Sequence, residues 1–116
     1  MIVEDNASIA EIIKDTLNGE PEYQAVAVHD GALALEVVRS LRASLVLLDL
    51  NIPGMDGLQI YDMMQADPML RQIPVIFLTA NANREEFRRR RFTNILEKPF
   101  DLDDLLAQVA AVLKQE

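Results

Sequence analysis

The sequence predicts an α/β fold, a doubly wound parallel sheet of five strands. Short apolar runs alternate along the chain with stretches whose apolar residues recur at helical spacing. Two of the runs, Leu45–Leu48 and Pro74–Leu78, are almost continuously apolar, which is typical of parallel strands covered on both faces. No linker, repeat or low-complexity segment interrupts the alternation, so we expect residues 1–116 to form one domain.

Each apolar run has the length of a single strand. The first run begins at Met1, so we expect the first strand to be short or incomplete. Strands that alternate with helices are joined by right-handed crossovers and therefore lie parallel in the sheet. The five expected strands are Met1–Val3, Tyr23–Val28, Leu45–Leu48, Pro74–Leu78 and Asn94–Leu96.

Four of the stretches between and after these runs carry an apolar stripe typical of a helix. The first helix should begin after Asn6, with Ser8 and Glu11 as a capping box. The third should end near Asp67 and Pro68, because proline cannot continue a helix. The four stripes are Ile9, Ile13 and Leu17; Leu33, Val37, Val38 and Leu41; Ile60, Met63 and Met64; and Leu102, Leu105, Leu106, Val109 and Leu113.

The composition narrows the range of functions. The chain has 116 residues, half of them hydrophobic, and a formal charge of −8. This charge argues against binding to nucleic acid or to an anionic membrane and suits a protein that binds cations. The absence of cysteine excludes a disulfide framework or a cysteine metal site. No apolar run approaches the roughly 20 residues of a membrane helix, and we see no signal peptide, so we expect a cytoplasmic protein.

Charged and polar residues stand where the strands end. Glu4 and Asp5 end the first strand. Asp49, Thr79 and Lys98 end or follow the third, fourth and fifth. Because such sheets bind ligands beyond the carboxyl ends of their strands, we expect all five residues at one rim. One ammonium does not neutralise three carboxylates, so the carboxylates repel one another unless a cation binds. Mg²⁺ takes carboxylate ligands together with phosphate oxygens.

A carboxylate beside such a cation can attack phosphorus. We expect Asp49 to be this nucleophile and to form an acyl phosphate. Lys98 and the metal would neutralise charge, and the Thr79 hydroxyl would donate a hydrogen bond to a phosphoryl oxygen. No general base is needed, because carboxylates are ionised at neutral pH.

Four motifs occur in order along this pattern: IVEDN at residues 2–6, VLLDLNIPGMDG at 46–57, IPVIFLTA at 73–80 and LEKPF at 96–100. With them the chain resembles the receiver domain of two-component response regulators along almost its whole length. The resemblance implies a flavodoxin-like (βα)5 fold with strand order 2-1-3-4-5. It also implies a signalling domain that turns over no external substrate.

The resemblance further implies roles for the rim residues. Asp49 would accept phosphate from a phosphohistidine on a sensor histidine kinase or a histidine phosphotransfer protein, and the domain would then switch its affinity for a downstream effector. Mg²⁺ would be held by Asp5, Asp49 and the backbone carbonyl of Asn51, with Glu4 acting through water.

Residues after the fourth and fifth strands also match positions of the family. Lys98 would pair with the phosphoryl group, and its bond to Pro99 would be cis. Asn51 and Asn81 occupy positions that tune the lifetime of the phosphate.

The segment before the last strand departs from the family pattern. Thr79 and Lys98 are 19 positions apart, about three residues fewer than usual and just under one helical turn. The fourth helix, expected within Arg84–Arg91, should therefore be short, shifted or partly unwound. Ile95 stands where the family commonly has a Tyr or Phe that rotates on activation, so the common aromatic switch is absent.

Several alternatives stay open at the sequence level. A phosphorylation-independent interaction module with the receiver fold would explain Ile95 and the altered fourth helix. An aspartate-nucleophile phosphatase is disfavoured, because Asn51 replaces its second acid. A nucleotide site is disfavoured by the lack of a phosphate-binding glycine loop. The run Arg88–Arg91 suggests either a solvated helix face or a patch for a partner, and His29 suggests a surface turn. A phosphorylation-linked dimer also stays open.

Overall fold

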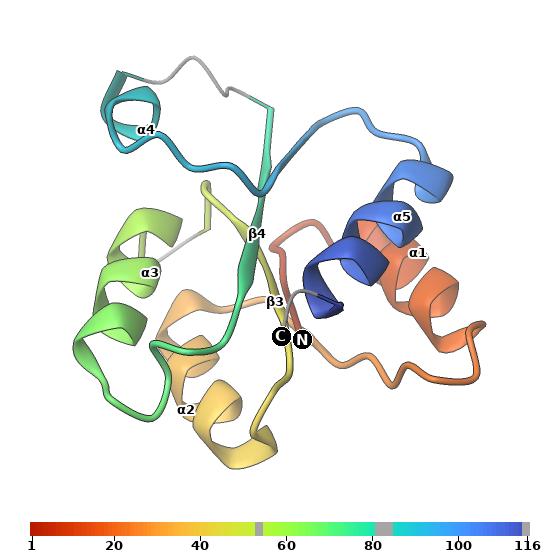
Figure 1. Cartoon of the computed structure of the whole chain (residues 1–116), viewed down its shortest axis with the longest axis horizontal. Coiled ribbons are helices and arrows are strands. Elements are labelled where there is room, and N and C mark those ends of the chain that lie inside the picture. Colours follow the sequence, from red (N-terminus) through yellow and green to blue (C-terminus); the bar gives the residue numbers. More distant parts are fainter. Residues whose placement is uncertain (53–54, 81–84, 115–116) are drawn as a thin grey trace.

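A computed structural model of the chain describes residues 1–52, 55–80 and 85–114 and has the predicted α/β architecture (Figure 1). The five strands pair in parallel in the predicted order, β2-β1-β3-β4-β5. The strands are β1 (Ile2–Val3), β2 (Ala27–Val28), β3 (Val46–Asp49), β4 (Val75–Thr79) and β5 (Ile95–Glu97). The helices in the described part are α1 (Ala7–Asn18), α2 (Gly31–Leu41), α3 (Gly57–Ala66), α4 (Glu85–Arg89) and α5 (Leu102–Leu113).

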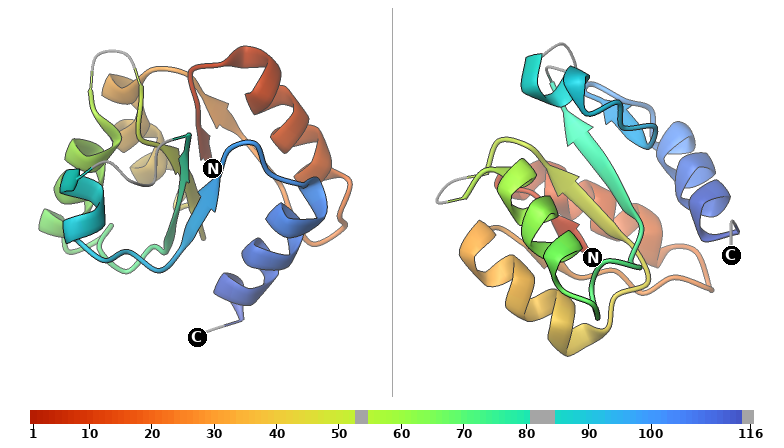
Figure 2. Two further views of the ribbon diagram at one scale, coloured as in Figure 1. Left: turned by 90° about the horizontal axis from the view of Figure 1, so that it is seen from above. Right: turned by 60° about the vertical axis from the view of Figure 1, so that its left-hand side comes forward.

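Helices cover both faces of the sheet, α1 and α5 on one side and α2, α3 and α4 on the other (Figure 2). The side chains of β3 alternate between these two layers. Val46 and Leu48 pack with α2 and α3, whereas Leu47 packs with α1 and α5. Both layers are apolar, which explains why β3 and β4 are continuous hydrophobic runs. None of the described helices is both long enough and apolar enough to cross a membrane.

The start of α1 corrects one prediction. The helix begins at Ala7, and the Asn6 side chain is its cap, accepting a hydrogen bond of 3.1 Å from the Ile9 backbone N–H. Ser8 therefore lies inside the helix, and the predicted capping box of Ser8 with Glu11 is wrong. Asn6 already satisfies one of the free N–H groups of the first turn, so the helix starts earlier.

The buried face of α2 also differs from the predicted stripe. Val38 is buried as expected, but Leu33 and Leu41 are 51% and 48% exposed, and Ala34 and Leu35 pack into the core instead. All five are apolar, so helical spacing alone did not identify the face that meets the sheet. In α3, Ile60 and Met64 are buried, whereas Met63 is 47% exposed.

The end of α3 and the length of α4 confirm two predictions. The α3 helix stops at Ala66, before Asp67 and Pro68. The α4 helix has five residues and lies within the expected range. Its chain turns away at Arg91, whose φ of 53° is left-handed and cannot continue a right-handed helix.

The second strand is shorter than predicted. It has only two residues, Ala27 and Val28, although the apolar pattern begins at Tyr23. The backbone N–H of Ala25 donates instead to the Asn18 side chain at the end of α1, with a distance of 2.7 Å. That bond attaches Ala25 to α1, whereas the next residue, Val26, accepts from the Ile2 N–H of β1 at 2.8 Å.

Candidate functional site

The parallel register brings the predicted site residues to one rim of the sheet. Asp49 ends β3 and Thr79 ends β4, while Glu4 and Lys98 directly follow β1 and β5. Because β1 lies beside β3 and β3 beside β4, their last residues are neighbours in space. The predicted convergence of strand ends is therefore present in the structure.

Two of the carboxylates are buried at this rim and share one lysine. Glu4 is 0% exposed and Asp49 3% exposed. The Lys98 Nζ donates to Glu4 Oε1 at 2.5 Å and to Asp49 Oδ2 at 3.0 Å. A buried carboxylate without a partner would be strongly unfavourable, so the lysine is what allows both acids to occupy this position.

The second oxygen of each buried carboxylate accepts from the backbone. The Asn6 N–H donates to Glu4 Oε2 at 3.2 Å, and the Asn51 N–H donates to Asp49 Oδ1 at 3.0 Å. In the described part of the chain, no buried side-chain nitrogen or oxygen is left without a partner. The two acids are therefore held in fixed orientations.

The chain around Lys98 fixes the direction of its side chain. Its backbone N–H donates to the carbonyl oxygen of Thr79 at 2.8 Å, which attaches the end of β5 to the end of β4. The Lys98–Pro99 peptide bond is cis, as expected. Thr79 itself is 1% exposed and faces the rim from β4.

The electrostatics of the rim show an excess of negative charge. Burial, together with the neighbouring Asp49, raises the pKa of Glu4 from 4.5 to about 7, even though Lys98 and the Asn6 N–H favour its charged form. Burial by itself lowers the pKa of Lys98, but its bonds to Glu4 and Asp49 raise it overall. One ammonium thus does not offset the carboxylates, and an added cation would favour the charged form of Glu4.

The rim fits a divalent metal ion by its donor set. Carboxylate oxygens of Glu4, Asp5 and Asp49 all lie within 4.8 Å of one another. Ligands on opposite sides of an octahedral Mg²⁺ are about 4 Å apart, so the spacing of these oxygens is close to that around one shared ion. Asp5 is exposed, unlike the other two acids, and so gives the cluster a side that reaches solvent.

The loop beyond Asp49 is held close to the site by a glycine. A Cβ atom at Gly57 would overlap the carbonyl oxygen of Asp49 and lie 2.8 Å from the Cα atom of Leu50. The Gly57 N–H donates to the Leu50 carbonyl at 3.0 Å. Asp56 and Gln59 form a capping box at the start of α3.

Three further residues were singled out in the sequence, namely Asn51, Asn81 and His29. Asn51 lies at the site through its backbone, whereas Asn81 lies outside the described residues. His29 is exposed, as expected, but its Nδ1 also donates to the backbone carbonyl of Glu4 at 2.8 Å. That bond and the Asn6 bond to Glu4 were not anticipated. Asn6 is part of the IVEDN motif, which could have indicated it; nothing around His29 in the sequence indicates its contact.

The fold and the rim together define a doubly wound α/β domain with a cluster of acidic side chains at the carboxyl ends of its strands. The chain belongs to the family of response regulator receiver domains, whose family model matches residues 1–110. In this family, Mg²⁺ binding and an aspartyl phosphate are general features.

Individual relatives agree with this assignment. The DNA-binding response regulator MtrA of Mycobacterium tuberculosis (strain ATCC 25618 / H37Rv) is 35% identical over 99% of this chain and 50% of its own length. The polar-differentiation response regulator DivK of Brucella anthropi is 29% identical and is covered over 94% of its length. The chain thus spans about half the length of the MtrA relatives.

A solved structure is similar in both fold and sequence. The receiver domain of the sensor histidine kinase PA1611 from Pseudomonas aeruginosa PAO1 has a TM-score of 0.85 and 27% identity. The match covers 97% of this chain and 93% of that one. That structure holds a magnesium ion in its active-site cleft.

Proposed function

We propose that residues 1–116 form one receiver domain that accepts a phosphoryl group on Asp49. The observation that carries this proposal is the position of the Asp49 carboxylate, buried at the end of β3 and 3.0 Å from the Lys98 ammonium, in one cluster with Glu4 and Asp5. The donor would be a phosphohistidine of a sensor histidine kinase or a histidine phosphotransfer protein. The output would be a changed affinity for a downstream effector.

In the proposed step, an Asp49 carboxylate oxygen forms a bond to phosphorus while the bond from phosphorus to the donor imidazole breaks. The Asn51 N–H holds Oδ1 of Asp49. Lys98 stands beside Oδ2, where its charge would stabilise the phosphoryl oxygens. Thr79, at the end of the neighbouring strand, would donate its hydroxyl to another of them.

The metal ion of the proposal is Mg²⁺. Asp5, Asp49 and the Asn51 carbonyl would hold it directly, and Glu4 would act through water, as its bonds to Lys98 and Asn6 suggest. Bound there, Mg²⁺ supplies positive charge to the transferring phosphoryl group. The domain would act on itself and turn over no external substrate. Its lack of cysteine fits the cytoplasm as its compartment.

The test is intact mass after incubation with Mg²⁺ and acetyl phosphate. We expect one phosphoryl adduct on the parent chain and none on Asp49→Asn or in the absence of metal. An adduct that persists in Asp49→Asn would show that another residue accepts the phosphate. No adduct on the parent, under conditions that label the DivK relative, would contradict the proposal and favour a phosphorylation-independent interaction module.

A further inference from the structure

A groove lies away from the acidic rim, near the amino end of β4. It has a volume of about 340 Å³ and is lined by residues of α3, of β4 and the segment before it, and of the segment between α4 and β5. Its floor is formed by the partly exposed rings of Tyr61 and Phe92, and the side chains of Val75 and Phe77 are buried beneath them. This volume is within the range of specific ligand sites, about 300–1,000 Å³.

The groove exists because α4 ends early. The five residues of α4 are about 7.5 Å long, whereas the five residues of β4 extend about 16 Å, so α4 is too short to cover the whole strand. Figure 1 shows α4 beside the carboxyl end of β4, whereas the groove lies near the amino end of that strand. Phe92, which follows α4, packs on Phe77 and Tyr61 with ring centroids 4.4 Å and 5.0 Å apart and fills only part of the gap.

The charge of the groove opposes that of the chain. Arg71 and Arg91 line it, and among the described lining residues there is no acid, in a chain of net charge −8. Neither arginine has an ion-pair partner among the described residues. The neighbouring Arg90, by contrast, is paired with Asp62.

The backbone at Arg91 adds a second observation. Its φ of 53° belongs to the left-handed region, which glycine adopts readily and other residues adopt at a cost of about 1 kcal/mol or more. The chain therefore places a charged side chain where glycine would end the helix more easily.

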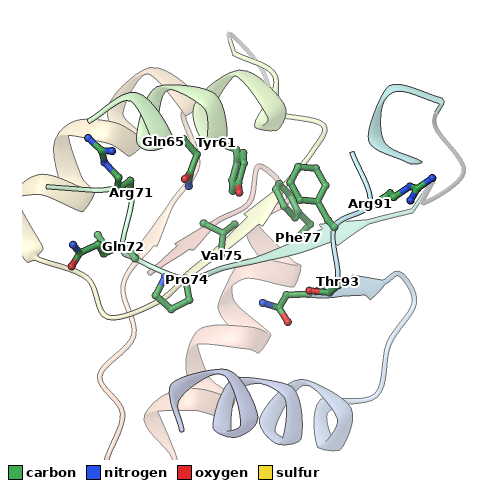
Figure 3. A pocket seen from close by; sticks show the side chains of 12 residues that line it. Tyr61, Gln65, Arg71, Gln72, Pro74, Val75, Phe77, Arg91 and Thr93 are labelled. Carbon is green, nitrogen blue, oxygen red and sulfur yellow. The ribbon is translucent and has the colours of Figure 1, made fainter. Parts of the chain in front are cut away.

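We propose that this groove binds an acidic peptide segment of a partner protein, with an apolar side chain on the exposed edges of the Tyr61 and Phe92 rings and carboxylates at Arg71 and Arg91. Figure 3 shows the two arginines at opposite ends of the groove, with Tyr61 and Phe77 between them. Two separated cationic ends and an apolar centre match an extended chain better than a compact ion. The site is separate from the phosphoacceptor, so it does not depend on the proposed function.

In the experiment, peptides of about 12 residues are selected from a displayed random library for binding to the full chain. The affinity of the best peptide is then measured by fluorescence anisotropy. We expect sequences with Asp or Glu on both sides of an aromatic residue or leucine. Arg91→Gly should keep the fold, because glycine suits φ 53°, and should weaken binding about tenfold, as should Arg71→Gln.

Two arginines serve as matched controls. Arg42 has the same left-handed backbone, φ 51°, at the end of α2, and Arg88 lies on α4 outside the groove lining. Arg42→Gly and Arg88→Gln should bind the peptide as the parent does. The proposal is overturned if no peptide is selected, if the selected peptides lack acids, or if Arg91→Gly and Arg71→Gln bind normally. Self-association of the chain that Arg91→Gly abolishes would also overturn it, because the occupant would then be a second copy.

Discussion

The acidic rim and the aromatic cluster under α4 differ in the forces that act between their side chains. At the rim, Glu4 and Asp49 are buried next to each other and depend on Lys98 for compensation. In the cluster, Phe77 contacts Tyr61, Phe87 and Phe92 with ring centroids 4.4–5.3 Å apart. One region places like charges together, and the other buries apolar surface.

Strand β4 contributes to both the acidic rim and the aromatic cluster. Phe77 and Thr79 lie two residues apart on β4 and so point to the same face of the sheet. The rings around Phe77 stabilise the strand whose end faces the acidic rim. A site with unfavourable electrostatics is tolerated when the surrounding structure holds it in place. We therefore expect substitutions in the two regions to have opposite effects on stability.

The largest effect is expected at the centre of the aromatic cluster. Phe77→Ala should lower the free energy of unfolding by about 3–5 kcal/mol, because it removes a fully buried ring and leaves a cavity. Urea denaturation measures the change. Phe77→Leu is the control and should lose less than about 1.5 kcal/mol, since most of the volume is kept. A loss below about 1 kcal/mol in Phe77→Ala would show that the cluster does not support β4.

The next largest change in the free energy of unfolding is expected from Mg²⁺ binding at the rim. At a free concentration about one hundred times its Kd, the metal should raise the free energy of unfolding by about 2.7 kcal/mol. Asp5→Ala should move this stabilisation to higher Mg²⁺ concentrations, while Asp15→Ala, an exposed acid of α1, should not. Without metal, Asp5→Ala should be neutral or slightly stabilising, because it removes one like charge. Equal Mg²⁺ affinity in Asp5→Ala and the parent would exclude Asp5 as a ligand.

A somewhat smaller effect is expected from pH in the absence of metal. The pKa of Glu4 is raised from 4.5 to about 7 by burial and by Asp49, so the folded protein binds this proton more tightly than the unfolded chain. The contribution to stability is complete below pH 4.5 and is lost as the pH rises through about 7, with a total of about 1–3 kcal/mol.

The measurement is the free energy of unfolding of the parent relative to Glu4→Gln over this pH range. The variant carries no titrating group at this position, so it should gain stability relative to the parent as the pH rises. A difference that stays constant with pH would mean that the pKa of Glu4 is not raised in the folded state. Saturating Mg²⁺ should reduce the pH dependence in the parent.

The smallest effect is expected at the surface of the aromatic cluster. Arg90 forms two hydrogen bonds to Asp62, of 2.5 and 3.1 Å, and its guanidinium lies 5.2 Å from the Phe92 ring centroid. Arg90→Ala should lower the free energy of unfolding by about 1 kcal/mol. Arg89→Ala, which removes an exposed pair with Glu85, should change it by less than about 0.5 kcal/mol. Equal losses in both variants would mean that the stacking on the rings adds nothing.

The sequence by itself determined the sheet and the members of the acidic rim. Continuous apolar runs predict buried parallel strands, and the carboxyl ends of parallel strands meet at one rim. Asp49, Thr79 and Lys98 could be identified because each ends or follows a strand. The sequence also predicted that α3 ends before Pro68, because the chemistry of proline alone stops a helix.

Only the tertiary structure decided which apolar residues face the core and where the helices begin. Leu33 and Ala34 both satisfy helical spacing in α2, but packing against the sheet buries the smaller one. The shift in the pKa of Glu4 depends on burial beside Asp49, 45 positions away in the sequence. The groove at Arg71 and Arg91 likewise follows from how far α4 extends over β4, because local sequence fixes the residues of a surface but packing fixes the space between them.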